Sequence, residues 1–443
     1  MFKIGLYERE ITPLFGNNLC GYFNARPVSG VKDKTYAKAV VISSCEKKLA
    51  MLSIDACMLD EETIDAIRKR VCAYSDIEDS LLLISATHSH TASPCAGESH
   101  ESTREIDRFY LKWLAMAGAD TVLLANQRLE DAKISFTETE ISGTTFVRNY
   151  LMRDGSVRTN PGVLNPDIIR PIAKPDYTAP VMFFENASGK KIGMIYSFAN
   201  HQDSVSGEEV SADWSGVVSK EMKRKFGEDF ISIFFIGTAG NVNQIDVNCK
   251  KPDYNPECCY QELGRTVYKA IASTLPSLSA LEGEISEINE QRLYRTRLMT
   301  DAELKEQKAI SDAVSLPRGI KLDASSPKEY FKACMANRAI KHNETAEKER
   351  EVRFQVIKIG YVLIFALPGE VYSQFGERIR SAFPKHKCFF ACLANNGWSY
   401  MPTKECYLPE LYESLFGSSK FYPEDTEAIF DRFIELGRML TEK

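Results

Sequence analysis

The chain has 443 residues, of which 44% are hydrophobic and 26% are charged, a balance typical of a globular protein with a sizeable buried core. The net charge of −6 and the pI of about 5.8 give no electrostatic basis for binding nucleic acid, and no apolar run approaches the length of a membrane span. We therefore expect a small-molecule partner, no nucleic acid and no stable membrane insertion, and leave the oligomeric state open.

Two features of the chain bear on its compartment. The N-terminus lacks the long apolar segment of a signal peptide, and the 12 cysteines include no Cys-x-x-Cys pair. Several cysteines lie in apolar, strand-like runs such as Cys388–Cys392, which indicates reduced and mostly buried thiols. We expect a cytoplasmic protein.

The first part of the chain alternates between strand and helix patterns. Residues 37–42 and 49–54 are apolar runs joined by a polar turn, which predicts a β-hairpin, and residues 61–74 carry apolar side chains at helical spacing. The apolar run 81–86 predicts a short buried strand that ends just before His88.

The same order recurs along the rest of the chain. The further predicted strands are 181–185, 191–198, 230–236, 356–367 and 388–393, and the further predicted helices are 103–124, 215–226, 260–275 and 424–440. Residues 8–13 are interpreted as a loop that leads into the domain. Residues 284–351 are charged and helix-prone, which predicts an exposed helical insertion. No internal repeat is present, and a chain of this length can form one large α/β unit.

Five of the predicted strands end in polar clusters. The clusters are His88 with His90, His201, Gly237–Asn243, Glu370 and Tyr400. In α/β sheets the carboxyl ends of the strands lie along one edge, and ligands bind there. The sequence therefore predicts an α/β fold, with a mixed β-sheet core flanked by helices and one site at the carboxyl ends of the strands.

The histidines of these clusters suggest a metal site. Residues at i and i+2 on extended backbone point to the same side, so His88 and His90 can reach one small volume. A histidine from each of two strands plus a carboxylate is a donor set of catalytic zinc sites, which keep an open position for water. Each residue also has a simpler interpretation. These are hydrogen-bonded loop histidines for His88 and His90, a core histidine for His201, a helix N-terminal carboxylate for Glu370 and a half-buried aromatic residue for Tyr400.

Two further segments have polar groups of interest. Arg148 is either a solvated arginine or a donor to a substrate oxygen. The segment Gly237–Asn243 could hold an anion on its backbone N–H groups, but it is not a P-loop because no Gly-Lys-Ser/Thr follows.

An ordered set of motifs resembles the catalytic domain of neutral ceramidases from about residue 4 to about residue 415. The motifs are Ile11-Thr-Pro13 with Cys20-Gly-Tyr22, Ala86–Pro94, Asn200-His201, Gly240–Asn243, Leu367-Pro-Gly-Glu370 and Tyr400–Tyr407. The resemblance implies that one Zn²⁺ ion is bound by His88, His201, Glu370 and Tyr400.

The same resemblance implies that His90, Arg148 and Tyr412 assist at the amide, Tyr412 being twelve residues after Tyr400. Where ceramidases carry a serine near the scissile amide, this chain has Asn243, which excludes a serine nucleophile there and makes Asn243 a candidate substrate-binding residue. From the resemblance we also expect residues 1–443 to form a single ceramidase-like catalytic domain, without the C-terminal immunoglobulin-like domain that ceramidases append.

We therefore expect a zinc-dependent hydrolase of the neutral ceramidase superfamily, in which metal-activated water attacks an amide bond. The alternatives are an esterase or a hydrolase of a small non-lipid substrate, a non-catalytic metal-binding or ligand-binding protein, and a phosphate-handling protein that uses residues 237–243 as an anion site.

Overall fold

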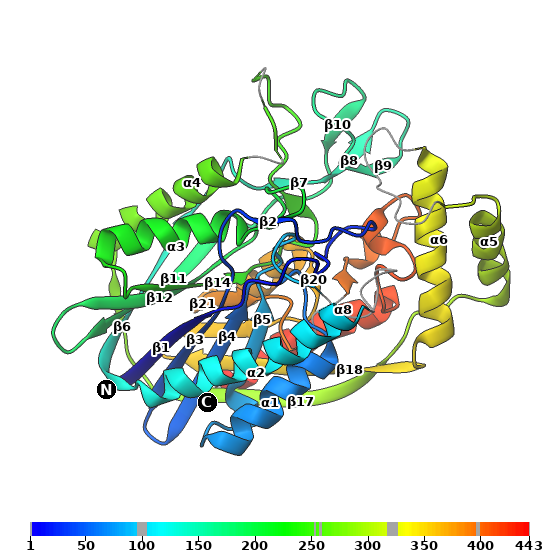
Figure 1. The fold of residues 1–443 in the computed structure, drawn as a ribbon. Helices are drawn as coiled ribbons and strands as arrows, with labels where there is room; N and C mark the ends of the chain where they lie inside the picture. The colour runs from blue at the N-terminus through cyan, green and yellow to red at the C-terminus, as the bar shows by residue number, and fades with distance from the viewer. Residues whose placement is uncertain are drawn as a thin grey trace.

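A large β-sheet forms the centre of the molecule (Figure 1). The structure is a computed structural model that describes residues 2–94, 104–251, 254–256, 259–316, 327–395 and 399–442. The strands of the large sheet are β1 (Phe2–Glu10), β3 (Tyr36–Ser44), β4 (Lys47–Ile54), β5 (Leu82–Ala86), β6 (Glu130–Glu140), β11 (Thr178–Asn186), β12 (Lys191–Phe198), β14 (Ile231–Ile236) and β16 (Ser279–Leu281). Their order is β14-β12-β11-β6-β1-β3-β4-β5, with β16 paired to β6, and the sheet is mixed because β4–β5 and β12–β14 are parallel.

A smaller sheet packs on one face of the large one. Its strands are β17 (Ile285–Arg295), β18 (Glu349–Ile359), β19 (Val362–Ala366) and β21 (Lys387–Ala391), in that order. Alternate residues of β4 belong to different cores, since Ala50 and Leu52 lie in one and Leu49 and Met51 lie in the other with Ile364 of β19. The period of two places one apolar face of β4 against the smaller sheet and the other against helices.

Helices cover the outer faces of both sheets. These helices are α1 (Glu61–Tyr74), α2 (Glu105–Gln127), α3 (Asp213–Phe226), α4 (Tyr260–Ser273), α7 (Ser373–Ala382) and α8 (Pro423–Thr441), whereas α5 (Asp301–Asp312) and α6 (Lys328–Thr345) pack on each other. The helix α2 packs on β1, β3 and β4, whereas α8 packs on β17 and β18. The predicted α/β class with a mixed sheet flanked by helices is confirmed. The paired helices α5 and α6 lie at the opposite end of the molecule from α3 and α4 (Figure 1).

Short elements connect the sheets to the loops. The short strands are β2 (Gly30–Val31) with β13 (Glu209–Val210), β7 (Phe146–Val147) with β15 (Val242–Asn243), β20 (Glu370–Val371) with β22 (Tyr400–Met401), and β8 (Asn149–Met152) with β9 (Val157–Thr159) and β10 (Ile168–Pro171). The short 3₁₀ helices are η1 (Asp79–Leu81), η2 (Leu275–Ser277), η3 (Lys404–Cys406) and η4 (Tyr412–Ser414).

Helix α1 shows why local patterns predicted several elements correctly. Its first turn is capped by Asp60, whose side chain accepts from the N–H of Thr63 at 2.6 Å. Ile64, Ile67 and Val71, at helical spacing, are all buried. The helix begins and ends where the sequence predicted.

Three segments differ from their prediction. Residues 8–10, expected within a loop, complete β1, which is central in the large sheet. Residues 285–295, expected within a helical insertion, form β17, which pairs with β18 along its whole length. The run 356–367 was expected as one strand, but it turns at residues 360–361 and forms the end of β18 and all of β19. In each case pairing with a distant strand overrode the local pattern.

The cysteines only partly follow the expectation. Cys20 is disulfide-bonded, so the prediction of reduced thiols is wrong at this position. Cys57, Cys388 and Cys392 are free and buried. Among the residues that the structure describes, no helix combines the length and the apolar character that crossing a membrane requires.

Candidate metal centre

Polar segments that follow several strands meet at one edge of the two sheets. His88 follows β5 and His201 follows β12, two strands that are far apart in the strand order. The segment after β21 links their neighbourhoods, because the N–H of Asn395 donates to a carbonyl of β5 and the N–H of Cys392 donates to a carbonyl of β14. The large sheet is therefore curved enough to bring both histidines to one place.

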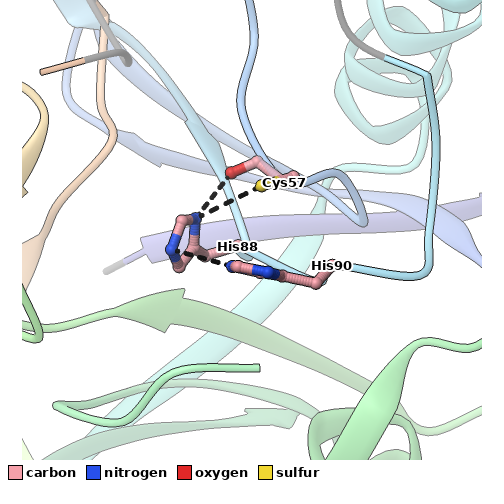
Figure 2. Close-up of side chains that lie close together, drawn as sticks. All are labelled: Cys57, His88 and His90. Carbon is pink, nitrogen blue, oxygen red and sulfur yellow. Dashed lines mark hydrogen bonds between the residues drawn. The ribbon is translucent and has the colours of Figure 1, made fainter. Parts of the chain in front are cut away.

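The orientation of His88 is set by its backbone and by one carbonyl. Its φ of 68° lies in the left-handed region, and its N–H donates to the carbonyl of Ala56 at 2.8 Å. Its Nδ1 lies 2.8 Å from the carbonyl oxygen of Cys57, which can only accept, so Nδ1 carries a proton (Figure 2). Its Nε2 lies 3.2 Å from Oε2 of Glu370.

The orientation of His201 follows from an arginine. Nη1 of Arg148 lies 3.2 Å from Nε2 of His201, and a guanidinium can only donate, so this nitrogen is the acceptor. The same Nε2 lies 3.4 Å from Oε2 of Glu370. Both histidines therefore direct Nε2 at one carboxylate oxygen.

These donor atoms form a buried cluster. One donor atom from each of His88, His201 and Glu370 lies within 4.8 Å of the other two, and all three side chains are buried. Apart from these two imidazole nitrogens, Oε2 of Glu370 has no hydrogen-bond partner among the described residues. Electron pairs that converge in this way repel one another unless a cation or a proton lies between them, so the donor set fits a metal ion.

The charges in the cluster are coupled. Burial and the adjacent Arg148 lower the pKa of His201 to about 3, so its imidazole is neutral. Burial alone would lower the pKa of His88, but the Glu370 carboxylate outweighs it and raises that pKa well above its ordinary value. Burial opposes ionisation of Glu370, yet the two histidines hold its pKa well below the usual range.

Tyr400 lies beside the carboxylate because β20 and β22 are parallel and pair it with Glu370. Its ring is buried, and the Cζ atom of Arg148 lies 5.4 Å from the ring centroid. Burial and the Glu370 carboxylate raise the pKa of Tyr400 well above its ordinary value, so the hydroxyl keeps its proton in the absence of a cation.

His90 lies on another side of His88, and their Nε2 atoms are 3.4 Å apart. Its Nδ1 is 3.6 Å from Oδ1 of Asp203, and Arg26 donates to its carbonyl oxygen at 2.5 Å. Gly21 packs against the ring, since a Cβ atom there would lie 2.6 Å from Nδ1 of His90, and its φ of +103° also favours glycine.

Arg148 is buried and held on two edges. Its Nε donates to Oε1 of Glu413 at 2.7 Å, and its Nη2 donates to the carbonyl oxygen of Gly240 at 2.8 Å. A Cβ atom at Gly240 would lie 2.3 Å from the backbone oxygen of Glu370, so only glycine permits this close approach. The loop thus positions the arginine and the carboxylate together.

Tyr412 is half-buried, and its ring centroid lies 5.6 Å from that of Tyr400. Nη1 of Arg338, from α6, donates to its hydroxyl oxygen at 3.1 Å. A tyrosine hydroxyl that accepts from an arginine still has its own proton to donate.

The side-chain amide of Asn243 donates one hydrogen bond and accepts another. Its Nδ2 donates to Oδ1 of Asn160 at 2.9 Å, and its Oδ1 accepts from the N–H of Ile245 at 3.0 Å. These contacts explain how an asparagine is accommodated at this buried position.

Residues 2–276 match the model of a family described as neutral/alkaline non-lysosomal ceramidase, N-terminal. The chain belongs to this family. The predicted resemblance to the neutral ceramidases is therefore confirmed.

Two solved structures of other proteins have the same fold as this ceramidase-family chain. A crystal structure of neutral ceramidase from Pseudomonas aeruginosa has a TM-score of 0.75 and 20% identity, and the alignment covers 100% of this chain and 74% of that one. A ceramidase complexed with C2 has a TM-score of 0.75 and 19% identity, with coverage of 100% and 75%. No curated protein matches the sequence. At this identity the likeness supports the fold alone.

Sequence reasoning missed two residues that shape the site of this ceramidase-family chain. Cys57 orients His88 through its carbonyl, and its sulfur lies 3.8 Å from Nδ1 of the same histidine (Figure 2). Cys57, His88 and His90 also form a second group whose donor atoms lie within 4.8 Å of one another, but Nδ1 of His88 is already engaged there. The signal for Cys57 was present, because it follows β4 as His88 follows β5. Glu413 had no local signal, since only the fold brings it to Arg148.

Proposed function

We propose that this protein is a zinc-dependent hydrolase that cleaves the amide bond between an acyl group and an amine. The observation that carries the proposal is the buried convergence of one donor atom each from His88, His201 and Glu370 within 4.8 Å, in a chain of the ceramidase family. Two imidazole nitrogens and one carboxylate are a donor set of catalytic zinc sites. Tyr400 is proposed as the fourth ligand, because it is paired with Glu370 at the same edge. When bound, zinc would supply Lewis-acid activation of water and of the substrate carbonyl.

His90 is proposed to move the proton. Burial and the neighbouring histidines His88 and His201 lower the pKa of His90 well below its ordinary value, so it is neutral and able to accept. Its Nε2 borders the cluster, 3.4 Å from Nε2 of His88. A base at this position would take a proton from the attacking water and return it to the leaving amine.

Arg148 and Tyr412 are proposed to stabilise the oxygen that becomes negative as the carbonyl is attacked. Burial would lower the pKa of Arg148, but Tyr400 and Glu413 raise it well above its ordinary value, so the guanidinium stays charged. Its Nη1 and the Tyr412 hydroxyl are donors of the kind that oxyanion sites use.

The substrate is proposed from the family and from the residue at position 243. The similar solved structures are named as ceramidases, and an N-acyl amine is therefore the proposed substrate class. Asn243 is proposed to contact the substrate without acting as a nucleophile. A single catalytic domain over residues 1–443 and a cytoplasmic location stay predictions.

Metal content tests the ligand assignment. We expect elemental mass spectrometry to find about one zinc per wild-type chain, and His88→Ala and Glu370→Ala each to lose most of it. Tyr412→Phe is the matched control, because it alters a neighbouring side chain outside the donor set and should keep the metal. Stoichiometric zinc in both alanine variants would refute the ligand assignment.

Hydrolysis tests the reaction. The zinc-loaded wild type is assayed on ceramide, on short N-acyl amines and on the matching esters. Turnover of N-acyl amines is the expected result. Turnover of esters alone, or of no substrate in the set, would refute the amidase proposal.

A further inference from the structure

A buried carboxylate that the proposed reaction does not use lies behind Arg148. Glu413, in η4, has no exposed surface. It accepts from Nε of Arg148 at 2.7 Å, from Nδ2 of Asn149 at 3.2 and 3.3 Å, and from Oγ1 of Thr159 at 3.0 Å. Both carboxylate oxygens therefore have donors, and the only cation among these donors is Arg148.

The guanidinium of Arg148 has one edge that faces the metal cluster. Glu413 holds Nε, and the carbonyl oxygen of Gly240 holds Nη2 at 2.8 Å. Nη1 is directed at Nε2 of His201, 3.2 Å away. A metal bound to Nε2 of His201 would use the electron pair that now accepts from Nη1. Nη1 would then be available to a substrate oxygen. The contacts of Nε with Glu413 and of Nη2 with Gly240 would still hold the arginine side chain.

Electrostatics makes this arrangement unfavourable without Glu413. A guanidinium and a divalent cation that share the neighbourhood of His201 repel each other, and the repulsion is strong in a buried site. Solvent does not screen it, because Arg148 and His201 are both buried. The Glu370 carboxylate already contacts the two histidines, whereas Glu413 contacts Arg148 at Nε and not at the Nη1 atom that faces His201.

We propose that Glu413 is a positioning residue, which neutralises Arg148 and holds its guanidinium so that the arginine and a divalent metal can occupy one site. The proposal rests on the proposed function, in that it takes His201 and Glu370 as metal ligands. A salt bridge that only joins η4 to β7 and β8 would have no effect on the affinity for metal beyond its effect on folding.

The test measures zinc affinity of the metal-stripped full chain by competition with a chromogenic chelator. Glu413→Gln keeps the size and the hydrogen-bonding shape but removes the charge. We expect it to weaken zinc binding by about 10-fold to 100-fold, the range found when outer partners of metal ligands are changed. Thr159→Val is the matched control, because it removes one hydrogen bond to Glu413 and leaves the charge, and it should bind zinc as the wild type does.

A double variant separates charge from structure. In Glu413→Gln/Arg148→Met the unneutralised guanidinium is gone, so we expect zinc affinity to return to within about threefold of the wild type. If Glu413→Gln alone unfolds, the double variant can still be measured, because it contains no unpaired buried charge and should fold. Thermal melts of all variants report folding separately.

The outcomes are distinct. Wild-type affinity in Glu413→Gln, or an equal loss in Glu413→Gln and in the double variant, would overturn the positioning role while leaving the metal site intact. A wild-type chain that binds no zinc would overturn the proposed function and this inference together.

Discussion

Replacing Gly21 with alanine is expected to lower the activity about 100-fold and the stability by about 1–2 kcal/mol. The added Cβ would lie 2.6 Å from Nδ1 of His90, whereas a comfortable contact is about 3.5 Å. The ring must therefore move by roughly 1 Å, because Gly21 is in a left-handed conformation whose backbone cannot readily yield. A displacement of about 1 Å in a catalytic group can lower the rate about 100-fold.

Replacing Gly16 with alanine measures the loss of stability that comes from the left-handed backbone alone. Gly16 also has a positive φ, +83°, but a Cβ there would meet no atom within 4 Å. Alanine at either position should cost about 1–2 kcal/mol of stability through the left-handed conformation. Only the change at Gly21 should disturb His90.

The assay compares the two variants side by side. Guanidinium chloride unfolding gives the stability, elemental mass spectrometry gives the metal content, and kcat/KM on an N-acyl amine gives the activity. Gly16→Ala should keep nearly full activity, and Gly21→Ala should lose about 100-fold with its metal retained. Equal activity of the two variants would refute the role assigned to the contact between Gly21 and His90.

Three further changes probe other parts of the molecule. Tyr412→Phe should lower kcat by about 100-fold to 1,000-fold at unchanged zinc content, and a kcat within threefold of the wild type would exclude it as an oxyanion donor. Cys57→Ala should keep stoichiometric metal in mass spectrometry, because its carbonyl and not its sulfur orients His88; loss of the metal would instead favour the thiol as a ligand. Burial raises the pKa of Asp213 from 3.8 to about 7, so between these pH values the carboxyl keeps its proton in the folded protein and loses it in the unfolded chain. The stability that Asp213 contributes is therefore fully present below about pH 4, and up to about 4 kcal/mol of it is lost as the pH rises from there through 7. Asp213→Asn should flatten the unfolding free energy between about pH 4 and pH 7, and parallel pH profiles would contradict this assignment.

Much of the fold could be predicted because its signals are local. Helix α1 carries its own cap and its own apolar stripe, so its ends were readable without any other part of the chain. The hairpin of β3 and β4 has adjacent strands and a short polar turn. In contrast, β6 lies between β1 and β11 in the large sheet, and its alternating pattern of charged and apolar residues did not reveal a central strand.

The site divides in the same way. The sequence predicted that four candidate ligands follow the ends of strands, namely His88, His201, Glu370 and Tyr400. The structure brings all four to one edge. The direction in which each donor atom points could not be predicted from the sequence. The carbonyl of Cys57 sets it for His88, and that residue is 31 positions away in the chain.

The sequence by itself determined which residue types stand at the ends of the buried strands, because strand and helix periods and caps depend on neighbours a few residues apart. It also carried the ordered motifs by which the family is recognised. Only the tertiary structure decided that the segments after β5 and β12 meet, that Nε2 of His88 and of His201 lie against one carboxylate oxygen, and that Glu413 holds Arg148 from 265 positions away. These contacts depend on how the sheet curves and on which strands pair, and no local pattern of side chains encodes either.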